Sequence, residues 1–229
     1  MLGVVTALPQ ERAWLAGAVG DADLVVELSG FGTRAASNAV RRLVKRGATC
    51  LASWGSAAGL DPSCVAGTVV LPRTVVIPGE GAYDTDRAWH RRLIERLENQ
   101  VPLSTGLLIH SVELLQTPAA KQQLYRQEGA VAADMESGAV ARLAAEHELP
   151  FVAIRVVLDA AGTSLPRAIA ASTDEEGRLV SGALCRRALC SPEDWPRFVR
   201  LALSCRVAGR AMRTTCQLAS PNLLCPDHC

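Results

Sequence analysis

Apolar residues in this chain fall into short runs separated by amphipathic segments, a pattern typical of alternating strands and helices. Leu2 to Leu8 and Ala22 to Leu28 are apolar runs of strand length. The segment between them, Pro9 to Val19, has proline in its first turn, where helices accept it. Further strands are expected at residues 50–53, 68–71, 74–77, 103–111, 130–134 and 150–159, and further helices at 34–46, 86–97, 118–127, 138–147 and 193–212.

This alternation predicts an α/β protein in which helices cover both faces of a sheet. A chain of 229 residues suits one large domain of this kind better than two small ones. We therefore expect one domain over residues 1–213 and a flexible, cysteine-bearing tail over residues 214–229. The turn after the first strand, Thr6 to Glu11, lacks a G-x-G-x-x-G sequence, which argues against a dinucleotide-binding Rossmann unit.

Composition narrows the function classes. The formal net charge is +1 and aromatic residues make up 4% of the chain, so neither an electrostatic surface for nucleic acid nor a base-stacking platform is indicated. Apolar residues make up 49%, enough for a substantial core, but no apolar run reaches the length of a membrane span. The first residues read as a strand rather than a signal peptide, so the expected compartment is the cytoplasm.

Six of the eight cysteines lie in the C-terminal part of the chain. A zinc site there would use Cys216, Cys225, His228 and Cys229, but the spacing contains no paired C-x-x-C. The interpretation that we prefer is a set of reduced thiols, as cytosolic proteins carry. The sequence therefore predicts no metal.

Acidic residues close the two most informative strands. Asp134, Met135 and Glu136 end one of them, and Asp159 ends the other. We expect these to be neighbouring strands whose carboxyl ends meet where α/β folds build their active sites. Carboxylates at such a place are costly unless they are paired or used. Taken singly, Glu136 also suits a helix cap, and Asp159 a cap or turn.

Two further residues follow strands nearby. Glu11 lies in the first turn of an expected helix, where the helix dipole favours an acid in any case. Ser56 lies in a loop of small residues whose backbone N–H groups could approach a ligand. Each of these is more often structural than functional when it stands alone, so a functional assignment depends on the order in which the motifs occur.

Five sequence blocks occur together in a specific order. They are Gly3 to Glu11, Ser29 to Gly32, Gly55 to Leu60, Asp134 to Glu136, and Arg155 to Asp159. In this order they resemble the purine nucleoside phosphorylase/nucleosidase family, most closely its methylthioadenosine/S-adenosylhomocysteine nucleosidase branch. The blocks extend from residue 3 to about residue 160. The resemblance implies a three-layer α/β/α fold with a central mixed, partly barrel-like sheet.

The resemblance also implies cleavage of the N-glycosidic bond of a purine nucleoside, through a ribose that resembles an oxocarbenium ion. Asp159 would donate a proton to N7 of the departing purine, and Glu11 would orient and deprotonate the attacking water. Glu136 would accept hydrogen bonds from the ribose hydroxyls. The other implied pocket residues are Met135 against the sugar, Ser56 beside base and ribose, Asp134 in support, and Leu114 and Leu115 against the purine. No metal or organic cofactor is implied.

Departures from the family pattern bear on the nucleophile and on activity. The chain has no Gly-Asp-Pro-x-Arg loop, and Ser53 stands where phosphorylases carry an arginine, so a phosphate dianion would lack charge-assisted partners. Hydrolysis is therefore favoured over phosphorolysis, although Arg34 or a neighbouring subunit could supply a cation. Ala58 replaces a usual glycine and Leu158 a small hydroxyl residue, which leaves open a nucleoside-binding protein without catalytic activity.

The segment after Asp159 concerns the 5′ end of the substrate. It is small and apolar, without the aromatic lid of the methylthioadenosine enzymes, and is similar to the hopanoid-associated phosphorylase subfamily. That resemblance implies adenosylhopane as the substrate, with Leu8, Phe31, Leu165 and Ile169 bordering an apolar route. A methylthioadenosine-type nucleosidase stays open as the alternative.

The resemblance also implies an assembly and a location. Family relatives are dimers or larger, so a homo-oligomer is expected. A lipid-tailed substrate would require transient contact with a membrane surface, which would place a cytoplasmic protein at the periphery of the inner membrane.

Overall fold

Ten strands of the computed structural model, which describes residues 1–16, 23–166, 169 and 194–225, form one mixed sheet. The strands are β1 (Leu2–Thr6), β2 (Leu24–Leu28), β3 (Cys50–Gly59), β4 (Val69–Val70), β5 (Thr74–Ile77), β6 (Gly81–Asp84), β7 (Leu103–Ser104), β8 (Leu108–His110), β9 (Ala132–Asp134) and β10 (Phe151–Asp159). The helices are α1 (Pro9–Ala13), α2 (Thr33–Lys45), α3 (Arg87–Leu97), α4 (Pro118–Glu128), α5 (Ser137–Glu146) and α8 (Trp195–Leu218), followed by the 3-10 turn η2 (Asn222–Leu224).

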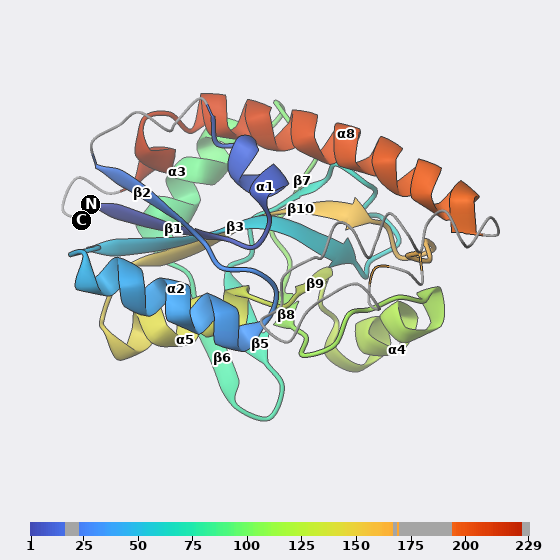
Figure 1. Ribbon diagram of the computed structural model, residues 1–229, viewed down its shortest axis with the longest axis horizontal. Helices are drawn as coiled ribbons and strands as arrows, with labels where there is room; N and C mark the ends of the chain where they lie inside the picture. The colour runs from blue at the N-terminus through green and yellow to red at the C-terminus, as the bar shows by residue number, and fades with distance from the viewer. Residues whose placement is uncertain (17–22, 167–168, 170–193, 226–229) are drawn as a thin grey trace.

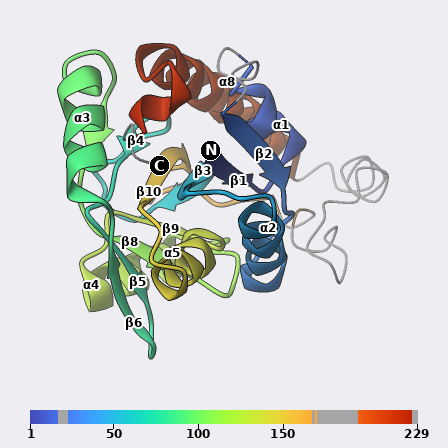
Figure 2. The same cartoon turned by 90° about the vertical axis from the view of Figure 1, so that its left-hand side faces the viewer.

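Helices cover the sheet on both faces (Figures 1 and 2). Alternate residues of the long strands point to opposite faces, as the strand period of two requires. Val4 of β1 packs in the core cluster that includes residues of α3 and α8, whereas its neighbour Val5 packs in the cluster that includes residues of α2 and α5. The predicted α/β class with a central mixed sheet is confirmed.

The central strand β3 changes its neighbour partway along one side. Its first residues pair with β1 in parallel as far as Ser53, and its last residues pair with β9 in antiparallel fashion from Ala58. β10 runs parallel to β3 along the other side. Between the two partners, the N–H of Ser56 bonds to a side chain, that of Glu11, instead of a strand. The change of neighbour therefore opens the sheet at the residues that the sequence singled out.

The prediction that the two acid-bearing strands are neighbours is wrong. β3 lies between β9 and β10, pairing Ala133 with Ala58 on one side and Asp159 with Ala58 on the other. The two acidic ends approach each other because β9 crosses the end of β3 in the antiparallel direction. They do not meet as the carboxyl ends of adjacent parallel strands.

Several element boundaries differ from the expected ones. β3 continues to Gly59 through the segment expected to be a loop, because β10 pairs with it along that length. The expected strand at residues 103–111 is two strands, since β7 pairs with β4 whereas β8 pairs with β5 and β9. The first helix ends at Ala13, short of the expected end at Val19. Residues 17–19 of its expected range, most of the segment that follows Pro166, and residues 226–229 lie outside the described residues.

The C-terminal segment also differs from the expected flexible tail as far as Cys225. α8 extends to Leu218, and Cys216 and Leu223 are buried. The indole Nε1 of Trp89 donates a hydrogen bond of 2.7 Å to the carbonyl oxygen of Leu223. The segment is ordered by this contact and by burial against α3. None of the described helices is long and apolar enough to cross a membrane.

Candidate active site

A cavity of about 270 Å³ lies where β3 changes its neighbour. The structure brings every predicted site residue to its lining: Leu8, Glu11, Phe31, Ser56, Leu114, Leu115, Asp134, Met135, Glu136 and Asp159. Leu165 and Ile169, expected along the route to the 5′ substituent, line it as well. Residues as far apart in the chain as Leu8 and Ile169 thus share one site, and the role of each predicted residue remains a prediction.

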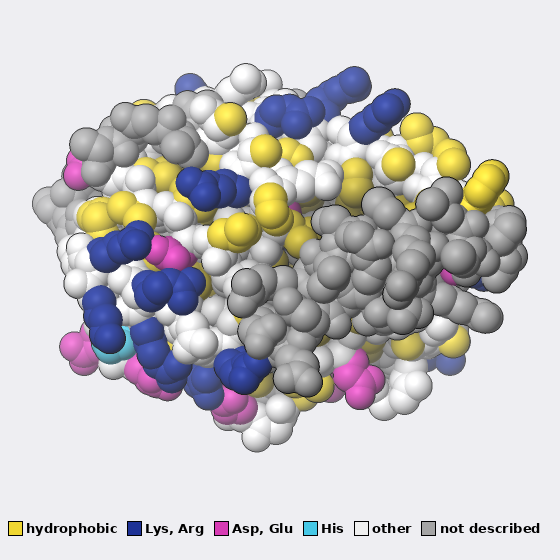
Figure 3. Space-filling view, viewed as in Figure 1, with side chains coloured by type: hydrophobic (Ala, Val, Ile, Leu, Met, Phe, Trp, Pro, Cys, Tyr) yellow, Lys and Arg dark blue, Asp and Glu magenta, His cyan; other side chains and the backbone are white. Residues whose placement is uncertain are grey.

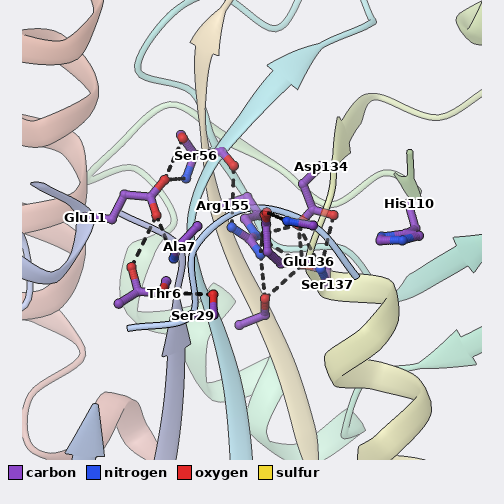
Figure 4. A network of polar contacts seen from close by, with 12 residues as sticks. Thr6, Ala7, Glu11, Ser29, Ser56, His110, Asp134, Glu136, Ser137 and Arg155 are labelled. Carbon is purple, nitrogen blue, oxygen red and sulfur yellow. Dashed lines mark hydrogen bonds and ion pairs between the residues drawn. The ribbon is translucent and has the colours of Figure 1, made fainter. Parts of the chain in front are cut away.

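Five hydrogen bonds hold the carboxylate of Glu11 in place (Figure 4). Its Oε1 accepts hydrogen bonds from the backbone N and the Oγ of Ser56, at 2.8 and 2.6 Å. Its Oε2 accepts from the backbone N atoms of Ala7 and Leu8, both at 3.1 Å, and from Thr6 Oγ1 at 3.2 Å. The side chain is buried, at 1% exposure. These contacts fix the orientation of the carboxylate at the gap between β1 and β9.

Gly55 permits this arrangement. A Cβ atom at that position would lie 2.5 Å from Arg155 Nη1 and 2.8 Å from Glu11 Oε2, closer than real contacts allow. The requirement for glycine therefore comes from the close approach of a buried arginine and of the candidate base.

A buried ion-pair network lies beneath the cavity (Figure 4). Arg155, 1% exposed, places Nε 2.7 Å from Asp134 Oδ2 and 3.0 Å from Ser137 Oγ. Its Nη2 donates to Ser53 Oγ at 2.6 Å. Asp134 also accepts from the backbone N of Ser137, the first residue of α5, at 3.2 Å. Asp134 thus makes the contacts of a supporting residue, because it joins β9, α5 and the arginine of β10.

Glu136 faces the cavity beside this network. Its Oε1 accepts a hydrogen bond of 2.9 Å from the backbone N of Gly32, and its Oε2 lies 3.9 Å from Arg155 Nη2. Burial raises the pKa of Glu136 to about 7, an effect that Arg155 opposes and Asp134 reinforces. Glu136 occupies the N-cap position of α5, but its side chain makes no capping bond to that helix.

Asp159 ends β10 with a buried lysine as its partner. Lys121 Nζ lies 2.5 Å from Asp159 Oδ2, and the lysine side chain is wholly buried. Burial raises the pKa of Asp159 to about 6, although the lysine charge and its hydrogen bond lower it. A carboxyl group of this pKa carries a proton in an appreciable fraction of molecules near neutral pH, which suits a general acid.

The site contains three residues to which sequence reasoning gave no role. Arg155 was noted only as part of a motif, yet a cation inside an otherwise apolar strand signals a buried partner. Ser137 carries no such signal. Lys121 shares one face of α4 with Leu124 and Tyr125, at the spacing i, i+3 and i+4. That spacing is the signal that indicates a position on the buried side of the helix.

The charged side chains that line the cavity, among the described residues, are all acids. No lysine or arginine is among the described residues that line the cavity, whereas Glu11, Glu113, Asp134, Glu136 and Asp159 all do so. No three His, Cys, Asp or Glu residues in the described ranges are grouped so as to hold a metal ion. Two ligands of the zinc alternative, His228 and Cys229, lie outside the described residues.

The mixed sheet and its cavity of buried carboxylates define the protein as an α/β protein with an enzyme-like site, and comparison with known proteins gives its family. Residues 4–189 match the family model described as the Phosphorylase superfamily. The chain belongs to this family.

Two curated relatives share the same name, 5′-methylthioadenosine/S-adenosylhomocysteine nucleosidase. The protein from Mycobacterium bovis is 26% identical over 219 residues, covering 70% of this chain and 86% of the relative. The protein from Tolumonas auensis is 31% identical over 168 residues, covering 63% of this chain and 71% of the relative. The predicted enzyme class and the resemblance to this branch are thereby confirmed.

Solved structures of low identity share the fold. The 5′-methylthioadenosine/S-adenosylhomocysteine nucleosidase of Neisseria meningitidis, in complex with methylthio-immucillin-A, has a TM-score of 0.71 at 17% identity, covering 95% of this chain and 97% of that one. The futalosine hydrolase of Helicobacter pylori has a TM-score of 0.67 at 14% identity, covering 94% and 97%.

Proposed function

We propose that this protein hydrolyses the N-glycosidic bond of a 5′-substituted adenosine and releases adenine. The observation that carries the proposal is the meeting of Glu11, Glu136 and Asp159 in one cavity. The three acids come from α1, the start of α5 and the end of β10. Each is at most 5% exposed and has different polar partners, so each is held in a separate environment suited to a separate task.

The proposed roles follow from those environments. Asp159, with its raised pKa, donates a proton to the purine so that a neutral base departs. Glu136 accepts hydrogen bonds from the ribose hydroxyls and favours the positive charge that develops on the sugar. Glu11 takes a proton from the attacking water. Met135 supplies a polarisable apolar surface against the sugar.

Water is proposed as the nucleophile instead of phosphate. A phosphate dianion needs arginine, lysine or converging N–H donors. The described lining of the cavity contains five carboxylates and no cation. Arg155 is close, but it is buried and already bonded to Asp134, Ser137 and Ser53. A phosphate ion in the cavity would therefore face mainly like charge.

An apolar 5′ substituent fits the cavity better than a charged one. Leu8, Phe31, Leu165, Ile169 and Leu201 line it, so the amino-acid tail of S-adenosylhomocysteine would have no described cation for its carboxylate. The volume of about 270 Å³ is near the lower end of small-molecule sites, roughly 300–1,000 Å³, so a long tail would extend beyond it. We propose adenosylhopane as the substrate and ribosylhopane as the product.

A comparison of substrates tests the proposal. Adenine release is measured by chromatography from methylthioadenosine, S-adenosylhomocysteine and an adenosine that carries a long apolar 5′ tail, each with and without inorganic phosphate. We expect the lipid-tailed substrate to have a kcat/KM at least about tenfold above the others, the gain that one or two more buried methylene groups provide. Phosphate should leave the rate unchanged.

Each outcome of this comparison has a definite meaning. A rate that rises with phosphate, with ribose 1-phosphate as product, would replace hydrolysis by phosphorolysis. Preference for methylthioadenosine would assign the protein to the activity for which its curated relatives are named. Binding of all three nucleosides with no adenine released would favour the non-catalytic alternative.

The outer face of α8 supports contact with a lipid surface. Val199, Leu203 and Val207 are 61%, 55% and 51% exposed, one helical turn apart. Arg200, Arg206 and Arg210 are exposed beside them, and α8 contains no acidic residue. Figure 3 shows arginine and apolar side chains together along the top of the molecule, where α8 lies. Apolar and cationic side chains on one helix face are typical of helices that lie in the interface of anionic membranes.

Vesicle sedimentation tests this contact. We expect the protein to pellet with vesicles that contain anionic phospholipid and to remain in the supernatant with neutral phosphatidylcholine. Val199→Glu with Leu203→Glu should reduce binding at least about tenfold, since two apolar side chains are lost and two like charges are added. The same variant should cleave a short, water-soluble substrate at the wild-type rate.

Two results would contradict the lipid assignment. One is equal binding to anionic and neutral vesicles that the variant does not change. The other is a dimer, seen by size exclusion without lipid, that the variant converts to a monomer. The second result would identify the α8 face as a subunit contact.

A further inference from the structure

Lys121 makes an unusual set of contacts for a lysine. Its Nζ lies 2.5 Å from Oδ2 of Asp159 and donates to the carbonyl oxygens of Asp159, Ala160 and Thr163, at 3.2, 3.0 and 2.9 Å. The side chain is wholly buried, and the partner carboxylate is 6% exposed. All four acceptors belong to the end of β10 or to the turn that follows it.

Burying the ammonium group of Lys121 costs free energy, and its partners all lie at the end of β10 or in the turn after it. An ammonium group loses a large hydration energy on burial, and only good partners recover it. The lysine comes from α4, and the acceptors come from the end of β10 and the turn after it, 38 to 42 positions later in the chain. A buried ammonium group needs a counter-charge, and here the counter-charge is the one carboxylate of β10 that also lines the cavity. The same Nζ holds the backbone on which that carboxylate is carried.

We infer that Lys121 is a positioning residue for Asp159, which holds the carboxyl group through Oδ2 so that the acidic proton is carried on Oδ1 and directed at the purine. This inference rests on the proposed function, because it assigns a task to the acid of that site. Lys121 itself is not among the residues that line the cavity, so it would act through Asp159.

The lysine has two separable effects on the acid. The first is orientation, because the same Nζ contacts both the Asp159 carboxylate and the backbone carbonyl of that residue. The second is charge, because a cation beside a carboxylate favours the ionised form. Among the residues that the structure describes, the other titratable groups lining the cavity are Glu11, Glu113, Asp134, Glu136 and Cys205, all of which are acids. None of them can replace the positive charge if the lysine is lost.

The test is a double-mutant cycle in kcat and in the pH profile. Lys121→Met keeps the length of the side chain and removes the charge and the donors. We expect kcat to fall about 10- to 100-fold with a KM within about threefold of wild type, as for a misplaced catalytic group. The limb at which activity falls with rising pH should move to higher pH, because the unpaired Asp159 holds its proton longer. Lys121→Arg, which keeps the charge, should leave that limb in place.

The second half of the cycle separates positioning from general support of the fold. In an Asp159→Asn background, Lys121→Met should cost no further activity, because the group through which it acts is already gone. An equal loss in both backgrounds would overturn the inference. So would a Lys121→Met enzyme that keeps the wild-type kcat and pH limb while Asp159→Asn is inactive. Circular dichroism and thermal melting check that each variant is folded, and Lys121→Gln replaces any methionine variant that is not.

If the proposed function is wrong, the wild-type protein will release no adenine from any nucleoside in the comparison. The coupling of the pair would still be measurable by following the Asp159 carboxyl resonance in ¹³C-aspartate-labelled protein. An apparent pKa that is equal in wild type and in Lys121→Met would then overturn the inference without any turnover.

Discussion

Asp159→Asn is expected to lower kcat about 10³-fold, within the range that general acids contribute. The amide has nearly the shape of the carboxyl group and can still bond Lys121 through its oxygen, so the fold and the cavity should persist. It has no acidic proton, however, and adenine would have to leave as an anion. Single-turnover release of adenine measures the loss. KM should change little, because the interaction that is removed belongs to the transition state.

The pKa values of Asp159 and Glu136 predict how the activity of the wild-type enzyme depends on pH. Asp159 must be protonated to act, and its pKa of about 6 makes activity fall as the pH rises above that value. Glu136 must be ionised to accept from the ribose, and its pKa of about 7 makes activity fall as the pH drops below that value. The kcat/KM profile should therefore be bell-shaped, with a maximum between pH 6 and 7 and macroscopic pKa values that belong to the coupled site.

The variants separate the two limbs. Residual activity in Asp159→Asn should rise through about pH 7 and then stay level, because only Glu136 still titrates. A nucleoside analogue with a leaving group that needs no protonation serves as the control, and Asp159→Asn should cleave it at nearly the wild-type rate. Unchanged turnover of the adenine nucleoside by this variant would show that Asp159 is not the acid.

Glu11→Gln is expected to have the second-largest effect, a loss of about 10²- to 10⁴-fold in kcat as for removal of a general base. Water would no longer be deprotonated as it attacks the sugar. The amide nitrogen would also face an N–H donor whichever way it turned, since Ser56 N donates to one oxygen of Glu11 and Ala7 N and Leu8 N to the other. That mismatch should lower the free energy of unfolding by about 1 to 3 kcal/mol.

Binding and activity must be measured separately for Glu11→Gln. Calorimetry should show that the folded variant still binds the nucleoside, because Glu136 and the apolar walls are intact. Glu113→Gln is the matched control, since Glu113 also lines the cavity but is exposed and has no assigned role. It should keep wild-type activity. If Glu11→Gln keeps it too, another group activates the water, and the proposed mechanism is wrong.

Local patterns predicted most of the architecture. Period-two apolar strands and amphipathic helices depend on nearby residues, so β1, α3, α4 and β10 lie within a few residues of their expected positions. The two errors of arrangement have a common cause. Strand order depends on pairing between residues far apart, so the sequence did not show that β3 separates β9 from β10, or that β3 continues through its glycine-rich segment. The packing of the C-terminal segment against Trp89 is equally non-local.

For the site, the sequence by itself predicted which acids would lie together. Glu11, Glu136 and Asp159 stand in motifs whose order is specific to the family, and all three line one cavity. Only the tertiary structure decided what surrounds each of them. Lys121 and Arg155 reach Asp159 and Asp134 from other elements, and burial raises the pKa of the Asp159 carboxyl group. The free energy of a buried ion depends on its desolvation and on its partners in space, and neither quantity is encoded in a local pattern of residues.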